Sequence, residues 1–126
     1  WIDKIATGVG VILYSPEHRC AAGFHVLRGV SKGQKVDNPG YFADTALDQA
    51  IQEFIRRGIP LRVSVAIAGG ASLLSSTGAQ DVGSVLVRQV KEILAERKLG
   101  VKLENVGGTK LRTMILNIDE GKIKIS

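Results

Sequence analysis

Histidine and cysteine are the residue types best suited to acid–base or covalent chemistry, and this chain has few of them. His25 lies in GFHVLRG, residues 23–29, among apolar and small residues, and ADTA follows at residues 43–46. A catalytic histidine needs a nucleophile beside it and a third group that fixes its tautomer. A histidine in an apolar strand is also commonly a hydrogen-bonded core residue. The residues alone therefore leave a catalytic and a structural interpretation of His25 open.

Cys20 is the one cysteine of the chain and the first nucleophile to consider. It precedes His25 by five residues in what the pattern predicts to be a single strand. Side chains alternate across a strand, so this odd separation places the two side chains on opposite faces, about 16 Å apart along the chain. We therefore interpret Cys20 as a small buried apolar residue.

Two further segments carry candidate functional residues. Thr45, or Asp44 before it, is well placed to cap a helix, with Asp48 completing the spacing of a capping box. The glycine- and serine-rich segment after residue 68 could present backbone amides to an anion or another small molecule, although a tight turn is the plainer interpretation. The candidate residues of this binding loop are Gly69, Gly70, Ala71, Ser72 and Leu74.

Composition narrows the class of protein. The chain has 126 residues, 44% of them hydrophobic, and no apolar run approaches the roughly 18 residues that span a bilayer, so one globular domain without membrane insertion is expected. A single cysteine excludes a disulfide framework and a multi-cysteine metal site, and the first residues, WIDKIATG, do not resemble a secretory signal. We therefore expect a cytoplasmic protein with no metal and no cofactor. The net charge of +5 is dispersed and aromatic residues make up only 5%, so a nucleic-acid partner is not expected.

Hydrophobic periodicity predicts the elements that must position these residues. Apolar runs at residues 7–14 and 20–27 predict a pair of strands, and residues 61–68 predict a buried strand. Helical spacing begins at Asp44 and ends at Gly58, and it returns over residues 82–98. Three short strands follow at KLENV, RTMILNI and KIKIS, the last two joined by a turn at residues 119–121. The order ββαβαβββ predicts an α+β fold in which two amphipathic helices pack on a mixed β-sheet.

Five segments carry a resemblance to a known family. GFHVL, NPGYFADTALDQAI, VAIAGGASLL, VGGTKLRT and NIDEGKIKI occur in this order along nearly the whole chain. In sequence and spacing they resemble the CheD family of chemoreceptor glutamine deamidases. Arg112, which follows the late glycine pair, also matches the family pattern. CheD proteins usually carry a further strand upstream, so we expect residues 1–126 to form a CheD-like domain that lacks the family's N-terminal strand.

The resemblance implies a cysteine-dependent hydrolysis. A cysteine attacks the side-chain amide of a receptor glutamine, a histidine acts as base, and a threonine orients the histidine. Residue matching places the base at His25 and the threonine at Thr45. The implied partners are the cytoplasmic helices of chemoreceptors and a CheC-type phosphatase.

The nucleophile is where this chain departs from the family. The family's cysteine belongs to a Gly-Ser-Cys-Val segment, which aligns its position with Gly8, or with Gly10 if the alignment shifts by two residues. A glycine has no side chain to attack with, so the resemblance favours a CheD-like protein that binds chemotaxis partners and is inactive as a deamidase. Two alternatives stay open: a deamidase of the active lineage whose cysteine was mutated or misaligned, and an anion-binding or other small-molecule-binding module built on the loop after residue 68.

Overall fold

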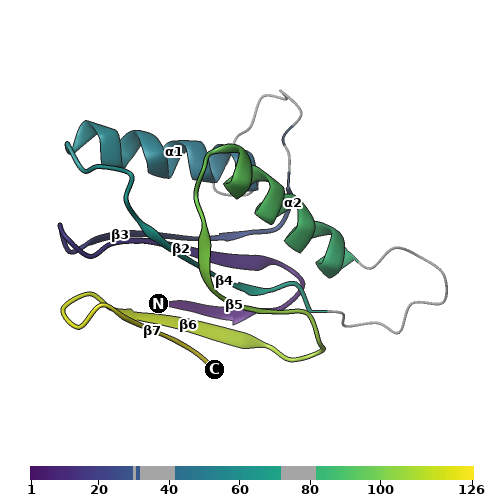
Figure 1. The fold of residues 1–126 in the computed structure, drawn as a ribbon. Helices are drawn as coiled ribbons and strands as arrows, with labels where there is room; N and C mark the ends of the chain where they lie inside the picture. Colours follow the sequence, from purple (N-terminus) through teal and green to yellow (C-terminus); the bar gives the residue numbers. More distant parts are fainter. Residues whose placement is uncertain (30, 32–41, 72–81) are drawn as a thin grey trace.

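A computed structural model describes residues 1–29, 31, 42–71 and 82–126 of the chain. The polypeptide forms one α+β domain, as predicted (Figure 1). Its elements in chain order are β1 (Ile2–Ile5), β2 (Val9–Ser15), β3 (Cys20–Val26), α1 (Ala43–Arg56), β4 (Ser64–Gly69), α2 (Val82–Glu96), β5 (Val101–Val106), β6 (Arg112–Asn117) and β7 (Lys122–Ile125).

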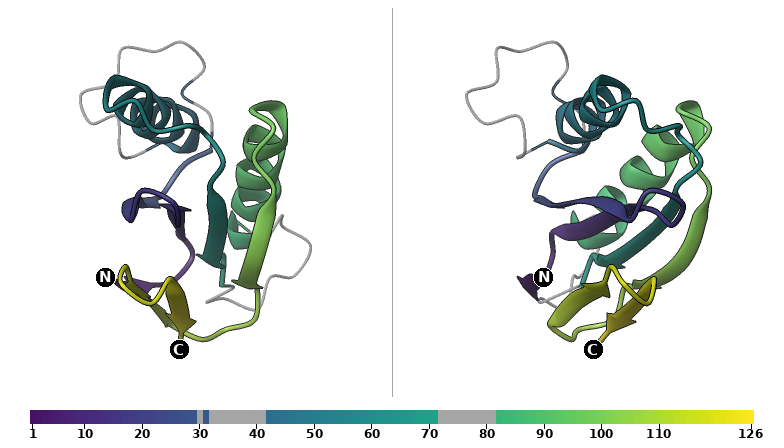
Figure 2. Two further views of the ribbon diagram at one scale, coloured as in Figure 1. Left: turned by 60° about the vertical axis from the view of Figure 1, so that its left-hand side comes forward. Right: turned by 90° about the vertical axis from the view of Figure 1, so that its left-hand side faces the viewer.

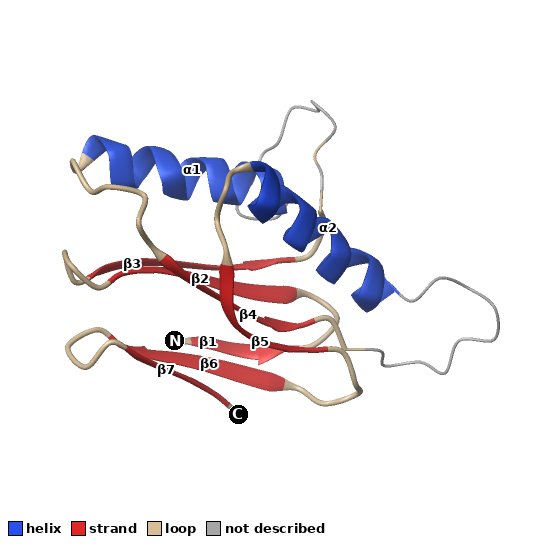
Figure 3. Ribbon diagram, viewed as in Figure 1, coloured by secondary structure: helices blue, strands red, loops and turns tan. Residues whose placement is uncertain are grey.

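The strands form two sheets stacked face to face. The larger sheet has the order β3-β2-β4-β5, with β4 and β5 parallel and the other neighbours antiparallel. The smaller sheet has the order β1-β6-β7 and is antiparallel. Both helices lie on the outer face of the larger sheet, and the smaller sheet covers its other face (Figures 2 and 3). The β2–β4 pair is therefore covered by protein on both sides.

Two hydrophobic cores result from this layering, one on each face of the larger sheet. Along β2 the side chains alternate: Val9, Val11 and Leu13 pack with the helices, whereas Ile12 and Tyr14 pack with the smaller sheet. Because the period of a strand is two residues, this alternation fixes the side toward which every residue of β2 and β3 points.

The helices bury one apolar stripe each. In α1 the buried residues recur at helical spacing, at Ala43, Ala46, Leu47, Ala50 and Phe54. The helix ends where Gly58 adopts a positive φ of 71° and the amide of Ile59 donates to the Phe54 carbonyl oxygen. Helices with one apolar stripe must pack that stripe on a sheet, which is the arrangement observed.

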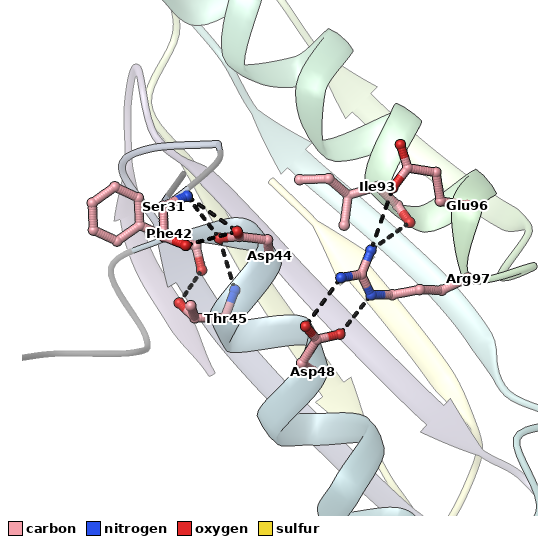
Figure 4. Close-up of polar contacts among 8 residues, drawn as sticks. All are labelled: Ser31, Phe42, Asp44, Thr45, Asp48, Ile93, Glu96 and Arg97. Carbon is pink, nitrogen blue, oxygen red and sulfur yellow. Dashed lines mark hydrogen bonds and ion pairs between the residues drawn. The ribbon is translucent and has the colours of Figure 1, made fainter. Parts of the chain in front are cut away.

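The predicted capping box does not form, because helix α1 begins earlier, after Phe42, whose side chain makes no capping hydrogen bond. The carboxylate of Asp44 accepts hydrogen bonds from the first-turn amide of Thr45 and from the amide and the hydroxyl of Ser31 (Figure 4). Asp48 pairs with Arg97 of the segment after α2. Both acidic side chains therefore connect α1 to other parts of the chain.

The first strand was not predicted. Strand β1 has only four residues, and Asp3 and Lys4 in its middle are exposed, so no apolar alternation marks it in the sequence. It adds to β6, in which its partners are Met114 and Arg112. The expectation that this chain lacks the family's N-terminal strand remains a prediction.

Candidate functional site

The register between β2 and β3 determines which residues share a face with His25. His25 pairs directly with Gly10, and directly opposed residues of antiparallel strands point to the same side. The neighbours of His25 along β3, Phe24 and Val26, pack with the helix-side core. The imidazole therefore lies on the other face, the one covered by the smaller sheet, at the end of β3.

Gly8 faces the imidazole. A Cβ atom built on buried Gly8 would lie 2.7 Å from His25 Nε2, 2.8 Å from the Val26 carbonyl oxygen and 2.9 Å from Leu27 Cδ2. A Cβ atom on Gly10 would instead meet Ile5 Cδ1 at 2.7 Å and Met114 Sδ at 2.9 Å, inside the core beneath the sheet. Of the two glycines to which the resemblance pointed, Gly8 is the one from which a side chain would reach the imidazole of His25.

The imidazole of His25 is desolvated. Its Nε2 atom is buried and has no hydrogen-bond partner in the described part of the chain. Burial lowers the pKa of His25 from its ordinary value of 6.5, because the charged form loses hydration. A neutral imidazole keeps a lone pair on one ring nitrogen and can accept a proton from a group placed beside it.

Thr45 is held by the helix to which it belongs. Its hydroxyl donates to the Phe42 carbonyl oxygen at 3.2 Å, and it lies in the first turn of α1, on the helix side of the larger sheet (Figure 4). The register places the imidazole of His25 on the opposite side. Since Nε2 of His25 has no partner among the described residues, Thr45 does not bind that atom. The role of Thr45 as the group that orients the base remains a prediction.

Cys20 lies where the sequence predicted. It begins β3, is half-buried and packs against the helix-side core, whereas His25 lies near the other end of the same strand and on the other face. The interpretation of Cys20 as a small apolar residue is confirmed, and its thiol does not reach the imidazole.

The turn at residues 69–71 holds the segment that contains Gly8. The amide of Gly70 donates to the Gly8 carbonyl oxygen, and the amide of Ala71 donates to the Ala6 carbonyl oxygen, each at 2.9 Å. Gly69 and Gly70 have φ angles of +119° and +65°, which L side chains rarely adopt. The amides of Gly70 and Ala71 are thus used within the fold and are not free to bind an anion. Two further residues of the predicted binding loop, Ser72 and Leu74, lie outside the described residues.

Two contributors to this site were missed by sequence reasoning. Leu27 forms one wall beside Gly8, and it is 46% exposed, which the apolar run that contains it does not predict. The other is Arg112, which the sequence marks only as part of a family pattern. Its side chain is buried and donates to the carbonyl oxygen of Gly69, the first residue of the turn at residues 69–71.

Other candidate sites lie elsewhere or are not found in the described residues. A cavity of about 610 Å³ is lined by Tyr14, Arg19 and Asp119, among others, at the end of β2 opposite to Gly8, so it does not belong to the His25 site. The described residues include no cluster of three or more His, Cys, Asp or Glu side chains that could hold a metal ion. None of the described helices is both long enough and apolar enough to cross a membrane.

Comparison with known proteins identifies relatives over most of the chain. The sequence model of the family described as "CheD chemotactic sensory transduction" matches residues 28–126. The "Chemoreceptor glutamine deamidase CheD" of Thermotoga maritima is 34% identical over 118 residues, covering 93% of this chain and 74% of that protein. A protein of Desulforamulus reducens named "Probable chemoreceptor glutamine deamidase CheD" is 34% identical over 122 residues, with 93% and 74% covered. One of the same name from Methanococcus maripaludis is 30% identical over 119 residues, with 93% and 77% covered.

The match to the family model begins after His25, but the alignments with relatives extend over nearly the whole chain. The segments that resembled the family, the order of the elements and these relatives therefore agree, and the chain belongs to the CheD family.

Proposed function

We propose that this protein binds chemotaxis partners without deamidating them. The proposed partners are the cytoplasmic helices of chemoreceptors and a CheC-type phosphatase. The relatives are named chemoreceptor glutamine deamidases, which supports a chemoreceptor as partner. The observation that carries the proposal is the geometry at Gly8, from which a Cβ atom would lie 2.7 Å from His25 Nε2.

The reaction implied by the family needs a thiol at this position. The imidazole takes the thiol proton, the sulfur bonds to the carboxamide carbon of glutamine, and the C–N bond breaks as the nitrogen leaves with that proton as ammonia. Water then attacks the thioester, a proton returns to the sulfur, and glutamate and the free thiol remain. Gly8 offers only a hydrogen atom, so the first covalent bond cannot form.

No other described side chain supplies the missing sulfur. Cys20 packs on the opposite face of the sheet from His25. Loss of the nucleophile from a unit of nucleophile and base removes essentially all covalent catalysis, because the base alone has no thiol to activate.

A second candidate is a deamidase lineage in which glycine replaced the cysteine of an active ancestor. The observation that favours it is the state of the base: His25 still has a buried, unpartnered Nε2 directed at position 8. On this reading, restoring one side chain restores the reaction. The amides that an anion-binding module would need are occupied at Gly70 and Ala71, and we do not propose that function.

The proposal is tested by measuring binding and chemistry in one sample. The chain is titrated into a chemoreceptor cytoplasmic fragment by calorimetry, and the fragment is then analysed for glutamate formation by mass spectrometry. We expect saturable binding and no change of glutamine to glutamate, with the same result for Cys20→Ser. Absence of binding to both the receptor fragment and a CheC-type phosphatase would refute partner binding, and glutamate formation that requires His25 would refute the inactive assignment.

A further inference from the structure

Arg112 is buried, and the part of the chain that the structure describes gives it no acidic partner. It is 7% exposed, whereas the other described arginines in ion pairs, such as Arg56 and Arg97, pair with carboxylates near the surface. No described carboxylate lies within ion-pair distance of its guanidinium. A buried cation that is compensated only by neutral oxygens costs stability, so its presence points to a specific role.

Three oxygen atoms, from the ends of β4 and β5, accept hydrogen bonds from this guanidinium. Its Nε donates to Asn105 Oδ1 at 2.9 Å, one Nη donates to the Gly107 carbonyl oxygen at 2.6 Å, and the other donates to the Gly69 carbonyl oxygen at 3.3 Å. Arg112 itself begins β6, in the smaller sheet, whereas Gly69 ends β4 in the larger one. The side chain thus ties the two sheets together at the end of the molecule that holds His25.

The bond to Gly69 leads directly to position 8. The carbonyl of Gly69 and the amide of Gly70 belong to one peptide group. The carbonyl accepts from Arg112 and from the amide of Gly107, and the amide donates to the Gly8 carbonyl oxygen at 2.9 Å. Glycines with positive φ flank this peptide, so its plane has few steric restraints of its own. Its orientation therefore depends on the groups that hold its two ends.

We propose that Arg112 is a positioning residue that fixes the plane of the 69–70 peptide and, through it, the backbone of position 8 opposite His25. This proposal rests on the proposed function in one respect, that position 8 faces the imidazole of His25. It extends the proposed function by naming Arg112 as the group that holds the backbone of position 8 at its distance from His25.

The first test uses the chain as it is. Amide hydrogen exchange is measured by NMR for Gly70 and, as an internal reference, for amides of the β2–β3 ladder. In Arg112→Met we expect exchange at Gly70 to accelerate about tenfold or more relative to the ladder, because the peptide is released, and Arg112→Lys should recover part of the protection. Arg97→Met is the matched control and should leave the ratio unchanged. An unchanged ratio in Arg112→Met would overturn the proposal.

A milder variant covers the case in which Arg112→Met does not fold. Asn105→Ala removes one acceptor of the guanidinium from an exposed position of β5 and keeps the charge. We expect a smaller acceleration at Gly70 in this variant. No change at Gly70 in a folded Asn105→Ala together with none in Arg112→Lys would count against the positioning role.

The second test measures chemistry at position 8. In Gly8→Cys, the alkylation rate of the new thiol is followed against pH, with Cys20 as internal reference. Adding Arg112→Met should raise the apparent thiol pKa by about one unit, which is about a tenfold loss of thiolate near neutral pH, and Arg112→Lys should restore part of it. Identical profiles with and without Arg112 would overturn the proposal. A thiol at position 8 that reacts no faster than Cys20 would instead contradict the proposed function, and Gly70 exchange would still decide the role of Arg112.

Discussion

The Cα hydrogen of Gly8 points along the direction in which a side chain would meet His25 Nε2. A Cβ atom there would also lie 2.8 Å from the Val26 carbonyl oxygen, which is backbone and yields less readily than a side chain. The absence of a side chain therefore allows the backbone at the end of β3 to approach Gly8 closely, and on the proposed function it also leaves the position without a nucleophile. A variant that places a side chain at position 8 therefore requires the neighbouring backbone of Val26 or of position 8 itself to shift.

The protonation of His25 follows from its burial. Burial lowers its pKa below 6.5, so the unfolded chain binds more protons than the folded chain between the two values. The free energy of unfolding should therefore fall as pH is lowered through this window, and His25→Gln should remove that part of the pH dependence. NMR titration of the imidazole protons measures the pKa of His25 directly. His18→Gln is the control for the unfolding measurement and should keep the part of the pH dependence that His25 causes. A pKa of His25 above 6.5 would contradict this account of the site.

Reactivity at position 8 provides a second prediction for single residues. An imidazole that can take up the thiol proton stabilises the thiolate as a thiolate–imidazolium pair, which lowers the apparent pKa of the thiol and raises its thiolate fraction. In Gly8→Cys the new thiol should react with iodoacetamide several-fold faster than Cys20, which lies on the other face, as mass spectrometry after brief treatment would show. Gly10→Cys is the matched control: its side chain points into the core formed by Ile5 and Met114, so its thiol should react slowly. Faster alkylation at position 10 than at position 8 would show that the register has been misinterpreted.

At the scale of elements, the turn after β4 anchors the segment that precedes β2. A Cβ atom on Gly69 would overlap the Gly8 carbonyl oxygen and would lie 2.5 Å from Ile5 Cγ2. Gly58, after α1, also has a positive φ, of 71°, but a Cβ atom added there would meet no described atom within 4 Å. Both positions have a positive φ, 71° at Gly58 and 119° at Gly69, but only Gly69 is closely packed.

Comparison of Gly69→Ala with Gly58→Ala separates these contributions. Gly58→Ala should lower the free energy of unfolding by about 1 kcal/mol, the backbone cost of an alanine at positive φ. Gly69→Ala should lower it by clearly more, because the turn must also move away from Gly8 and Ile5. Urea unfolding followed by circular dichroism measures both. Equal losses would mean that the close contact with Gly8 is readily relieved.

Among the described residues, an ion pair joins α1 to the segment that follows α2. Arg97 donates to both carboxylate oxygens of Asp48, at 2.6 and 3.0 Å, and this contact raises the pKa of Arg97 (Figure 4). Asp48 is half-exposed, so water and salt screen much of the interaction. A double-mutant cycle with Arg97→Ala and Asp48→Ala should give a coupling of about 0.5 to 1 kcal/mol that decreases at high salt. Arg88 and Glu92, 3.9 Å apart within α2, are the control pair and should show no measurable coupling.

At the scale of the whole molecule, the helices and the central strands could be predicted because their apolar residues recur with a clear period. The predicted helix from Asp44 was confirmed to within about a residue at each end, and the pairing of the strands at residues 7–14 and 20–27 was confirmed. Strand β1 could not be predicted, since its stability comes from β6, more than a hundred residues later, and not from a local pattern.

The site could be predicted only in part. The odd spacing of Cys20 and His25 predicted that their side chains lie on opposite faces of the sheet, because side chains alternate between the faces along a single strand. Three facts depend on how segments distant in the sequence pack against one another: Gly8 rather than Gly10 meets the imidazole of His25, Thr45 lies on the helix side of the larger sheet, and the amide of Gly70 is already bonded. A linear pattern carries no information about that packing.

Among the described residues, both sheets and the turn at residues 69–71 hold Gly8 beside the imidazole of His25. On the proposed function, the part of the reaction centre that Gly8 does not supply is the thiol. The whole molecule should therefore lack deamidase activity and regain it through one substitution.

The most direct test is ammonia release from a chemoreceptor cytoplasmic fragment by four proteins: the chain as it stands, Gly8→Ala, Gly8→Cys, and Gly8→Cys with His25→Ala. We predict that Gly8→Cys alone releases ammonia above background, because only it has both a thiol and a base. Gly8→Ala controls for the steric effect of a side chain on the strand. Ammonia release by the unaltered chain that is abolished by His25→Ala would contradict the account, because it would place the nucleophile elsewhere.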